Sequence, residues 1–275
     1  MEEVFKAILL GTVQGLTEFL PISSTAHLRI IPSFFGWKDI GASYTAVIQA
    51  GTMIAIIIYF WSDLVNMAKA FITSLKSKDF KSSDTHLLLM IILGTVPIVI
   101  FGYLLKDFIR NEFRNMYIVS ASLIFFSIVL FISERFTKKT VTIAQLGFAD
   151  ALFIGFFQSL ALIPGASRSG SAISGSFFRN MSRVDAARFS FLLSIPAVLL
   201  SGGYELYSQR AFLLSGESAV ISLAIATIVS AAVGYWSIWF LLSFIKKNSL
   251  LVFVIYRIIF GILIIILLST NIISN

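Results

Sequence analysis

Two short segments of the chain carry side chains that could bind an anion and transfer protons. The first reads GTVQGLTEFLPISSTAH over residues 11–27, and the second reads GFFQSLALIPGASRSG over residues 155–170. Each contains Gly-x-x-Gln-x-Leu, a few apolar residues, a proline and a cluster of small hydroxyl residues. The first copy adds Glu18 and His27, and the second adds Arg168. Together these groups could supply an acid, a base and an anion clamp.

The spacing of the first segment predicts a polar face. Gln14 and Glu18 are separated by one turn of a helix, so they share one face until Pro21 ends that helix. Both side chains can then point into one cavity.

Hydroxyl residues follow this proline at a predicted second helix. Ser23, Ser24 and Thr25 lie at its start, where hydroxyl groups cap backbone amides. His27 lies three residues after Ser24, on the same helix face. Glu18, Ser24 and His27 could therefore meet.

The second segment predicts an anion site at a helix start, where exposed amides and an arginine fork suit phosphate oxygens. Its residues are Gly165, Ser167, Arg168, Ser169 and Gly170.

Each of these features also has a structural interpretation. Serines at helix starts are usually caps, glycines usually permit close packing, and a lone histidine is more often structural than catalytic. Glu18 and Arg168 are harder to explain in this way, because an unpaired charge inside an apolar run is costly. A salt bridge between Glu18 and Arg168 is the structural alternative, but it would not require the flanking glycine and hydroxyl residues.

The elements that must position these groups belong to an integral membrane protein. Of 275 residues, 57% are hydrophobic, 13% are charged and 27 are phenylalanine, a composition that excludes a soluble chain. The absence of cysteine excludes disulfides, thiolate catalysis and cysteine-ligated metal. The apolar N-terminal stretch is interrupted by polar residues and no small-residue cleavage site follows, so we do not interpret it as a signal peptide.

Six apolar runs predict six transmembrane helices. They cover residues 44–61, 87–105, 116–133, 186–203, 218–245 and 249–270. Residues 4–36 and 143–180 are apolar but broken at their centres by glycine, proline and serine, which predicts two re-entrant helical hairpins. The expected fold class is therefore an all-α polytopic membrane protein.

The order of these segments predicts an inverted-topology repeat. Three spans separate the hairpins, so the second hairpin enters from the side opposite the first, and their breaks should face each other near the midplane. We expect one integral membrane domain over residues 1–275, with repeats at 1–140 and 141–275.

Loop charge predicts the orientation of the chain in the membrane. The side expected to be cytoplasmic carries Lys69, Lys76, Lys78, Lys81, Arg135, Lys138, Lys139, Arg179, Arg183, Arg188, Lys246 and Lys247. The opposite side carries Lys6, Arg29, Lys38, Lys106, Arg110, Arg114 and Arg210. Both termini and the first hairpin are thus expected outside the cytoplasm. The net charge of +7 mainly reflects this bias and does not argue for nucleic acid.

Other polar residues in apolar runs receive structural interpretations. Arg257 lies about two turns into the last run, where snorkelling to the interface explains it at least as well as a site role. Gln49, His86 and Asp150 are expected to be packing or boundary residues. Ala226, Ser230 and Gly234 form a small-residue stripe that predicts close helix packing.

The two motifs resemble a known family. QGLTEFLPISSTAH is similar to the first motif of bacterial undecaprenyl-diphosphate phosphatases, the bacitracin-resistance proteins, and PGASRSG is similar to their second motif. The resemblance covers nearly the whole chain. It implies an enzyme that removes the terminal phosphate of a C55 isoprenoid diphosphate and regenerates the carrier lipid of cell-wall synthesis. It also implies membrane lipid as the environment and a polyprenyl diphosphate as the substrate.

Carried over by position, the resemblance implies catalytic roles for Glu18, Ser24, His27 and Arg168. Substrate-binding positions would be Gln14, Ser23, Thr25, Gly165, Ser167, Ser169 and Gly170. Two positions depart from the family pattern, which often has glycine at Ala26 and threonine at Ala172. The loss of a hydroxyl at Ala172 argues against a contact there.

The resemblance also implies a divalent cation, Mg²⁺ or Ca²⁺. With glutamine at position 14, Glu18 and the diphosphate would be its main ligands. The expected mechanism has Ser24 attack phosphorus while His27, assisted by Glu18, accepts the serine proton. Direct attack by His27 or by an activated water are the alternatives.

The resemblance further implies the plasma (inner) membrane, and a homodimer is compatible with it. The loop charges predict that the site opens to the extracytoplasmic side. A secondary transporter or flippase of an anion or polyprenyl phosphate is the alternative function, because broken helices at the midplane are typical of transporters. A Glu-Ser-His group that faces an arginine exceeds what binding and release require, so it favours the enzyme.

Overall fold

The structure is a computed structural model that describes residues 2–37, 41–105, 115–208 and 217–273. In these ranges the elements are helical, apart from one isolated β-bridge between Val141 and Met181. The predicted all-α class is confirmed.

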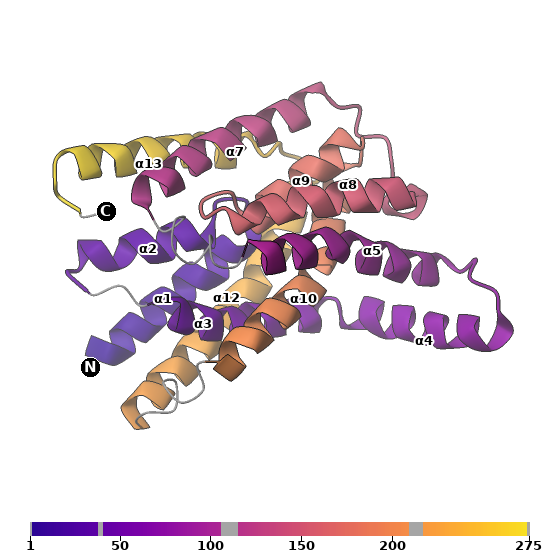
Figure 1. Ribbon diagram of the computed structural model, residues 1–275, viewed down its shortest axis with the longest axis horizontal. Coiled ribbons are helices and arrows are strands. Elements are labelled where there is room, and N and C mark those ends of the chain that lie inside the picture. The colour runs from indigo at the N-terminus through magenta and orange to yellow at the C-terminus, as the bar shows by residue number, and fades with distance from the viewer. Residues whose placement is uncertain (1, 38–40, 106–114, 209–216, 274–275) are drawn as a thin grey trace.

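The helices follow the chain as shown in Figure 1. They are α1 (Glu2–Phe19), α2 (Ser24–Phe34), α3 (Gly41–Tyr59), α4 (Trp61–Ser77), α5 (Ser83–Leu104), α7 (Met116–Phe136), α8 (Phe148–Ser159), α9 (Arg168–Phe178), α10 (Arg183–Ser208), α12 (Glu217–Phe244) and α13 (Leu251–Ser269). Two short 3-10 helices, η2 (Ile143–Gln145) and η3 (Leu160–Leu162), flank α8.

Several helices are long and apolar enough to cross a membrane. Among the described residues, five helices are long and apolar enough by themselves, namely α5, α7, α10, α12 and α13. A sixth span is obtained if α3 and α4, which form a bent pair, are counted together as one span. The chain is therefore an integral multi-pass membrane protein.

The first predicted span differs from the structure. It was expected to end at residue 61, but the helix bends by 69° beside Phe60 and continues as α4 to Ser77. Hydrogen bonds from Phe60 N to Ile56 O and from Leu64 N to Phe60 O continue across the bend. The apolar runs of the sequence did not predict α4, because this helix is amphipathic, with exposed Lys76 near its end.

Polar and apolar side chains are distributed as expected for a protein in lipid. Large apolar side chains are exposed on outer helix faces, including Ile92 on α5 and Ile259 on α13. Serine hydroxyls are buried instead, and those of Ser120 and Ser176 donate to carbonyls of their own helices. Hydroxyls satisfied in this way can be buried at low cost where no water is available.

The first hairpin is held in place by close packing of α1 on α12, and α3 also packs on α12 (Figure 1). A Cβ atom added at Gly11 would lie 2.5 Å from the carbonyl oxygen of Ala226. The Ser230 hydroxyl donates to Ile48 O at 2.7 Å. The predicted role of the Ala226, Ser230 and Gly234 stripe in close packing is confirmed. On the other side of the bundle, α8 packs against α5 through Gly94 and Gly155 in the same manner.

Ion pairs join the ends of helices on the side that was expected to be cytoplasmic. Glu134 pairs with Arg183 at 2.6 Å, Asp150 pairs with Arg179, and Asp63 pairs with Arg188. Asp150 also accepts from Gly147 N at the start of α8, in line with its interpretation as a boundary residue. The ring of His86 contacts Phe148, again at a helix boundary.

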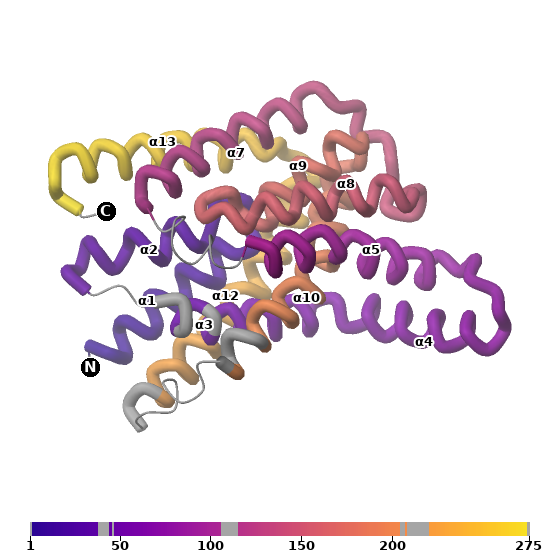
Figure 2. The backbone as a smooth tube through the Cα atoms, in the orientation of Figure 1, coloured from indigo at the N-terminus to yellow at the C-terminus, as the bar shows by residue number. Residues whose placement is uncertain are grey.

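The two broken segments form two helical hairpins, α1–α2 and α8–α9. Their turns come together near the middle of the molecule, as the tube in Figure 2 shows, and α13 lies beside α7 next to them. Chain breaks that would be costly in lipid are thus enclosed by protein.

Candidate functional site

The two hairpin turns have the same backbone geometry. Ser23 (φ 75°) and Ser167 (φ 71°) both adopt a left-handed conformation, which is uncommon for residues other than glycine. Each is followed at once by an 11-residue helix, which starts at Ser24 in α2 and at Arg168 in α9. Ser24 and Arg168 therefore occupy equivalent positions in the two hairpins.

Hydroxyl pairs support both turns. The hydroxyl oxygens of Ser23 and Thr25 lie 3.2 Å apart, and those of Ser167 and Ser169 are also 3.2 Å apart. The Ser169 hydroxyl additionally donates to Leu20 O at 3.3 Å, so it ties the second hairpin to the first. The positions expected to bind substrate thus line two turns that are joined directly.

Capping by hydroxyls differs between the turns. Ser167 accepts a hydrogen bond from Gly170 N at 3.2 Å and caps α9, as the structural interpretation of serines at helix starts would have it. Ser23 makes no such cap, and the hydroxyl of Ser24 is directed elsewhere. The expectation that Ser23 and Ser24 cap α2 is therefore wrong, since the Ser23 hydroxyl lies against that of Thr25 and the Ser24 hydroxyl donates to Glu18.

Glu18 is the centre of the cluster, and its side chain is only 8% exposed. Its Oε2 accepts from Ser24 Oγ at 2.7 Å and from Gln14 Nε2 at 3.0 Å. Its Oε1 accepts from Gln49 Nε2 at 3.1 Å and lies 3.5 Å from Arg168 Nη1. One carboxylate thereby joins α1, α2, α3 and α9.

Arg168 retains capacity for a further anion. Its side chain is 24% exposed, and its Nη1 makes no hydrogen bond within the described part of the chain although it is buried. A guanidinium that faces a carboxylate without full hydrogen bonding can donate to phosphate oxygens through its remaining N–H groups.

Only a few oxygen atoms near Glu18 in the described structure could act as ligands of a cation. Gln14 Oε1 is buried without a hydrogen-bond partner in the structure, and it belongs to the side chain that donates to Glu18. Among the described residues no group of three His, Asp or Glu side chains could hold a metal ion. Two protein oxygen donors suit a hard cation only when a ligand such as a diphosphate supplies further oxygens.

His27 does not contact Ser24 in the way that the sequence suggested. Its Nδ1 lies 2.8 Å from Ser23 O, and because a carbonyl can only accept, Nδ1 carries the proton. Its Nε2 then accepts from the Tyr256 hydroxyl at 2.6 Å. The ring also stacks on Phe260 with centroids 4.4 Å apart. Both ring nitrogens are thus occupied by groups outside the Glu18 cluster.

Glycines permit the second turn. Gly165 has φ 95°, and a Cβ at this position would lie 2.4 Å from Val119 O. A Cβ at Gly170 would lie 2.9 Å from Arg257 Nη1. The structure therefore requires glycine at both positions. This requirement is compatible with a contact between their backbone and a substrate.

Arg257 joins the two turns, and the snorkelling interpretation is wrong. The residue is 0% exposed. Its Nη2 donates to Gly165 O at 3.0 Å and to Ala166 O at 2.9 Å, and its Nη1 donates to Pro21 O at 3.3 Å. The turn carbonyls attract the guanidinium inward, away from the interface. The position of an arginine two turns inside an apolar run was the only sequence signal for this role. Its partners could not be predicted, because they are distant in sequence.

Gln49 was expected to be a packing residue, and this was also wrong. Its amide donates to Glu18, so it belongs to the site. The sequence signal for a site role was a polar side chain within an apolar run. The hydrogen bond to Glu18 could not be derived from that signal, because the two residues are 31 positions apart.

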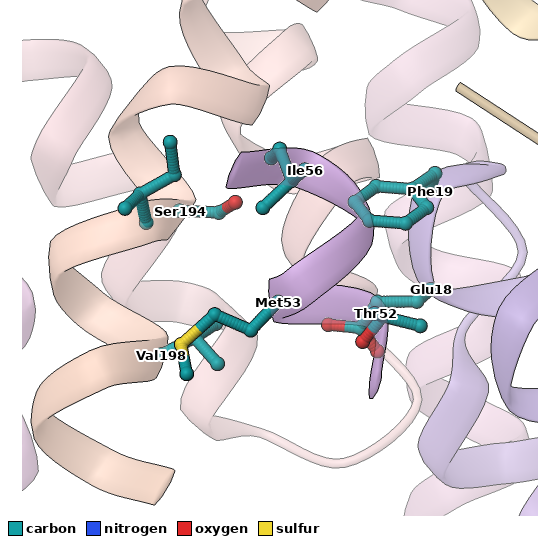
Figure 3. Close-up of a pocket in the computed structure, with 8 residues that line it drawn as sticks. Glu18, Phe19, Thr52, Met53, Ile56, Ser194 and Val198 are labelled. Carbon is teal, nitrogen blue, oxygen red and sulfur yellow. The ribbon is translucent and has the colours of Figure 1, made fainter. Parts of the chain in front are cut away.

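A small pocket lies beside Glu18 (Figure 3). It is formed by α1, α3 and α10, and its lining residues are Glu18, Phe19, Thr52, Met53, Ile56, Ser194, Ile195 and Val198. One end of the pocket is polar, and most of its wall is apolar.

Comparison with known proteins places this helical membrane chain in a family. Residues 7–263 match the family of the bacitracin resistance protein BacA. The undecaprenyl-diphosphatases of Chlorobium phaeovibrioides (strain DSM 265 / 1930) and Chlorobium chlorochromatii (strain CaD3) are each 48% identical over 98% of both chains. That of Chlorobaculum tepidum is 46% identical over the same share.

The chain therefore belongs to the bacitracin resistance protein BacA family. The resemblance inferred from the two motifs is confirmed.

Proposed function

We propose that this protein is an undecaprenyl-diphosphatase, which hydrolyses the terminal phosphate of a C55 isoprenoid diphosphate and regenerates the carrier lipid. The observation that carries the proposal is the hydrogen bond from Ser24 Oγ to Glu18, with Arg168 beside the same carboxylate. A poised hydroxyl, its acceptor and an anion clamp meet at one point. The names of the relatives favour hydrolysis over transport.

Arg168 and the first amides of α2 and α9 are proposed to bind the diphosphate. Ser24 and Arg168 begin these helices, and the first amides of a helix have no partner within it. Charge on the phosphate oxygens would be stabilised by donors that are already in place, which supplies much of the catalysis in phosphoryl transfer.

A divalent cation, Mg²⁺ or Ca²⁺, is proposed to join the site together with the substrate. Glu18 and Gln14 Oε1 would hold it with diphosphate oxygens, and it would neutralise charge on the transferred phosphoryl group. The buried and unpartnered Gln14 Oε1 supports this proposal.

Ser24 is the proposed nucleophile. Its Oγ attacks the terminal phosphorus, its proton passes to Glu18, and the bond to the bridging oxygen breaks. The prenyl monophosphate leaves with the proton from Glu18. Water then attacks the phosphoseryl group, its proton passes through Glu18 to Ser24 Oγ, and phosphate is released.

His27 is proposed to orient the first turn. It donates to Ser23 O, and the Tyr256 hydroxyl holds its other nitrogen. Its contacts support this role better than the expected role as the serine base. Attack by His27 itself is the alternative that the trapping experiment in the Discussion tests.

The membrane arrangement is proposed as six spans with two re-entrant hairpins in an inverted repeat. Figure 1 places the start of α1 and the end of α13 on the same side of the molecule, as an even number of spans requires. The matched geometry at Ser23 and Ser167 supports repeats over residues 1–140 and 141–275. By the loop charges, the first hairpin and the site open to the extracytoplasmic side of the inner membrane.

Phosphate release from farnesyl or undecaprenyl diphosphate by detergent-purified protein tests the function, with Mg²⁺ present and after its removal by a chelator. We expect release that requires the cation and that is lost in Arg168→Ala, a variant whose folding is checked by its thermal transition. A well-folded wild type that binds the lipid but releases no phosphate would refute the hydrolase and favour transport.

A further inference from the structure

The residue before Ser24 has an unusual backbone conformation. Ser23 combines φ 75° with ψ 98°, and the equivalent Ser167 combines φ 71° with ψ 121°. The left-handed region that is open to residues with a side chain has ψ of about 30–60°, so both serines lie outside it. Rotation about ψ of Ser23 sets the direction of its carbonyl and of the next N–H. Contacts from the surrounding structure must therefore hold the peptide plane between Ser23 and Ser24.

Different groups hold the two turns. In the second turn, Ser171 N donates to Ser167 O at 2.9 Å, and the Ser167 hydroxyl caps Gly170 N. In the first turn, the equivalent backbone hydrogen bond from His27 N to Ser23 O is 3.4 Å long, and Ser23 makes no cap. The His27 side chain compensates for both differences, because its Nδ1 donates to the same Ser23 carbonyl at 2.8 Å.

Tyr256 on α13 holds the imidazole in this position. Its hydroxyl lies 2.6 Å from His27 Nε2, and the two rings are nearly parallel, with an angle of 7° between their planes. Since the proton of the imidazole is on Nδ1, the Tyr256 hydroxyl is the donor to Nε2. Tyr256 is 41% exposed, whereas His27 is 5% and Ser23 is 1% exposed. Two hydrogen bonds in series thus connect a lipid-facing side chain with the buried turn.

The position of the Ser23 carbonyl has a direct consequence for Ser24. In a trans peptide unit the carbonyl and the N–H point in opposite directions. A fixed Ser23 O therefore fixes the direction of Ser24 N–H, which is the first amide of α2 and has no acceptor within that helix. The hydroxyl of the same residue donates to Glu18. One peptide plane thus sets the position of both the proposed nucleophile and an amide donor.

We propose that Tyr256 is a positioning residue of the reaction. Through His27 it holds the peptide plane between Ser23 and Ser24, so that the N–H and the hydroxyl of Ser24 are presented together to the terminal phosphate. This inference rests on the proposed function, since it concerns the same site. Such a contact affects the rate more than the affinity, because a misplacement of about 1 Å can lower the rate by about 10²-fold.

Tyr256→Phe tests this role, because it removes the hydroxyl and keeps the ring. The matched control is Tyr235→Phe on α12, a tyrosine that is 46% exposed and whose ring contacts Tyr59. In protein from the folded peak of size-exclusion chromatography, we expect kcat for farnesyl diphosphate to fall about tenfold to a hundredfold in Tyr256→Phe. KM should change much less, and the control should behave as wild type. An unchanged kcat, or an equal loss in both variants, would overturn the proposal.

Two substitutions of His27 separate positioning from proton transfer. The amide of an asparagine can place an N–H near the position of Nδ1, whereas that of a glutamine reaches the position of Nε2. We expect His27→Asn to keep about tenfold or more of the activity of His27→Gln, because only the asparagine can donate to Ser23 O. Equal and complete losses in the two variants would show that the imidazole itself reacts, and they would overturn the proposal.

The hydrogen bonds of the imidazole can be observed without substrate. The chain has two histidines, so His86→Gln leaves His27 as the one imidazole for ¹⁵N NMR. We expect a proton on Nδ1 and a hydrogen-bonded Nε2 whose resonance moves to that of a free nitrogen when Tyr256→Phe is added. A proton on Nε2, or an Nε2 resonance that does not respond, would overturn the proposal. Absence of phosphate release by wild type would instead refute the function, whatever the NMR signals show.

Discussion

Ser24 and Arg168 stand at the first positions of α2 and α9, and both reach the carboxylate of Glu18. The two halves of the chain thus contribute different groups from equivalent positions, a hydroxyl from one and a cation from the other. A diphosphate at this point would meet a nucleophile on one side and a charge clamp on the other. Under the proposed mechanism, neither motif alone would supply both groups.

Ser24 can be tested directly as the nucleophile. We expect a ³²P-labelled protein when wild type is quenched in acid during turnover of β-labelled prenyl diphosphate, because a phosphoserine is stable to acid. Ser24→Ala should trap no label and lose about three orders of magnitude in kcat, as is typical when one essential group is removed.

Thr17→Ala is the matched control for this experiment, since it removes a hydroxyl next to Glu18 in sequence that donates to Val13 O and not to Glu18. Label that is lost on acid treatment but persists at alkaline pH would instead identify a phosphohistidine and would exclude Ser24 as the attacking group.

Arg257 should matter for stability as well as activity. Arg257→Met leaves three turn carbonyls without their donor, at a cost of about 1–3 kcal/mol for each carbonyl that stays unpaired. Thermal unfolding in detergent, followed by loss of the folded peak in size-exclusion chromatography, should show a clear decrease in the transition temperature.

Arg168→Met provides the contrast, because it also removes a guanidinium but one with no hydrogen bond to the turns in the described structure. We expect this variant to lose activity with a smaller decrease in the transition temperature than Arg257→Met, because Glu18 keeps its hydrogen bonds from Gln14, Ser24 and Gln49. Equal thermal shifts in the two variants would contradict the role of Arg257 in holding the turns.

At the scale of helices, close packing positions the hairpins. The first helix of each hairpin crosses a helix of the other half, α1 on α12 and α8 on α5, and glycines lie at both crossings. In lipid such contacts depend on van der Waals packing and not on the hydrophobic effect. The accuracy of the site therefore depends on small residues far from the chemistry.

Gly11→Val tests this dependence. The new side chain would meet the backbone of Ala226, which cannot move without shifting α12. Overpacking of this kind costs about 1–3 kcal/mol, so we expect a lower thermal transition and reduced phosphate release. Gly203→Val on α10, where nothing lies within 4 Å, should leave both unchanged. A stable and fully active Gly11→Val would show that the crossing does not position the site.

The sequence predicted the helices better than it predicted their contacts. Five predicted spans match helices of the structure, because long apolar runs leave few other structures possible in lipid. The position of Glu18 near Ser24 also followed from local spacing and a proline. Gln49, Tyr256 and Arg257 could not be placed, since their partners are far away along the chain. The amphipathic α4 was missed for a different reason, namely its lack of a continuous apolar run.

At the scale of the whole molecule, the proposed orientation can be measured without removing native thiols, because the chain has no cysteine. Lys76→Cys near the end of α4 and Asn271→Cys after α13 are both exposed positions. In intact cells an impermeant maleimide should label Asn271→Cys only, and Lys76→Cys should react after permeabilisation. The reverse pattern would place the first hairpin and the site on the cytoplasmic side.

The central claim is that one hydrolytic site is shared by the two halves of the molecule. Its most direct test is a double-mutant cycle on phosphate release with Glu18→Gln, Arg168→Gln and the double variant, each checked for folding. Residues that act as a unit are strongly non-additive. We predict that each single change lowers kcat/KM by about 10³-fold and that the double variant is little worse than either. Single variants with near wild-type rates, or losses that simply multiply, would contradict a shared site.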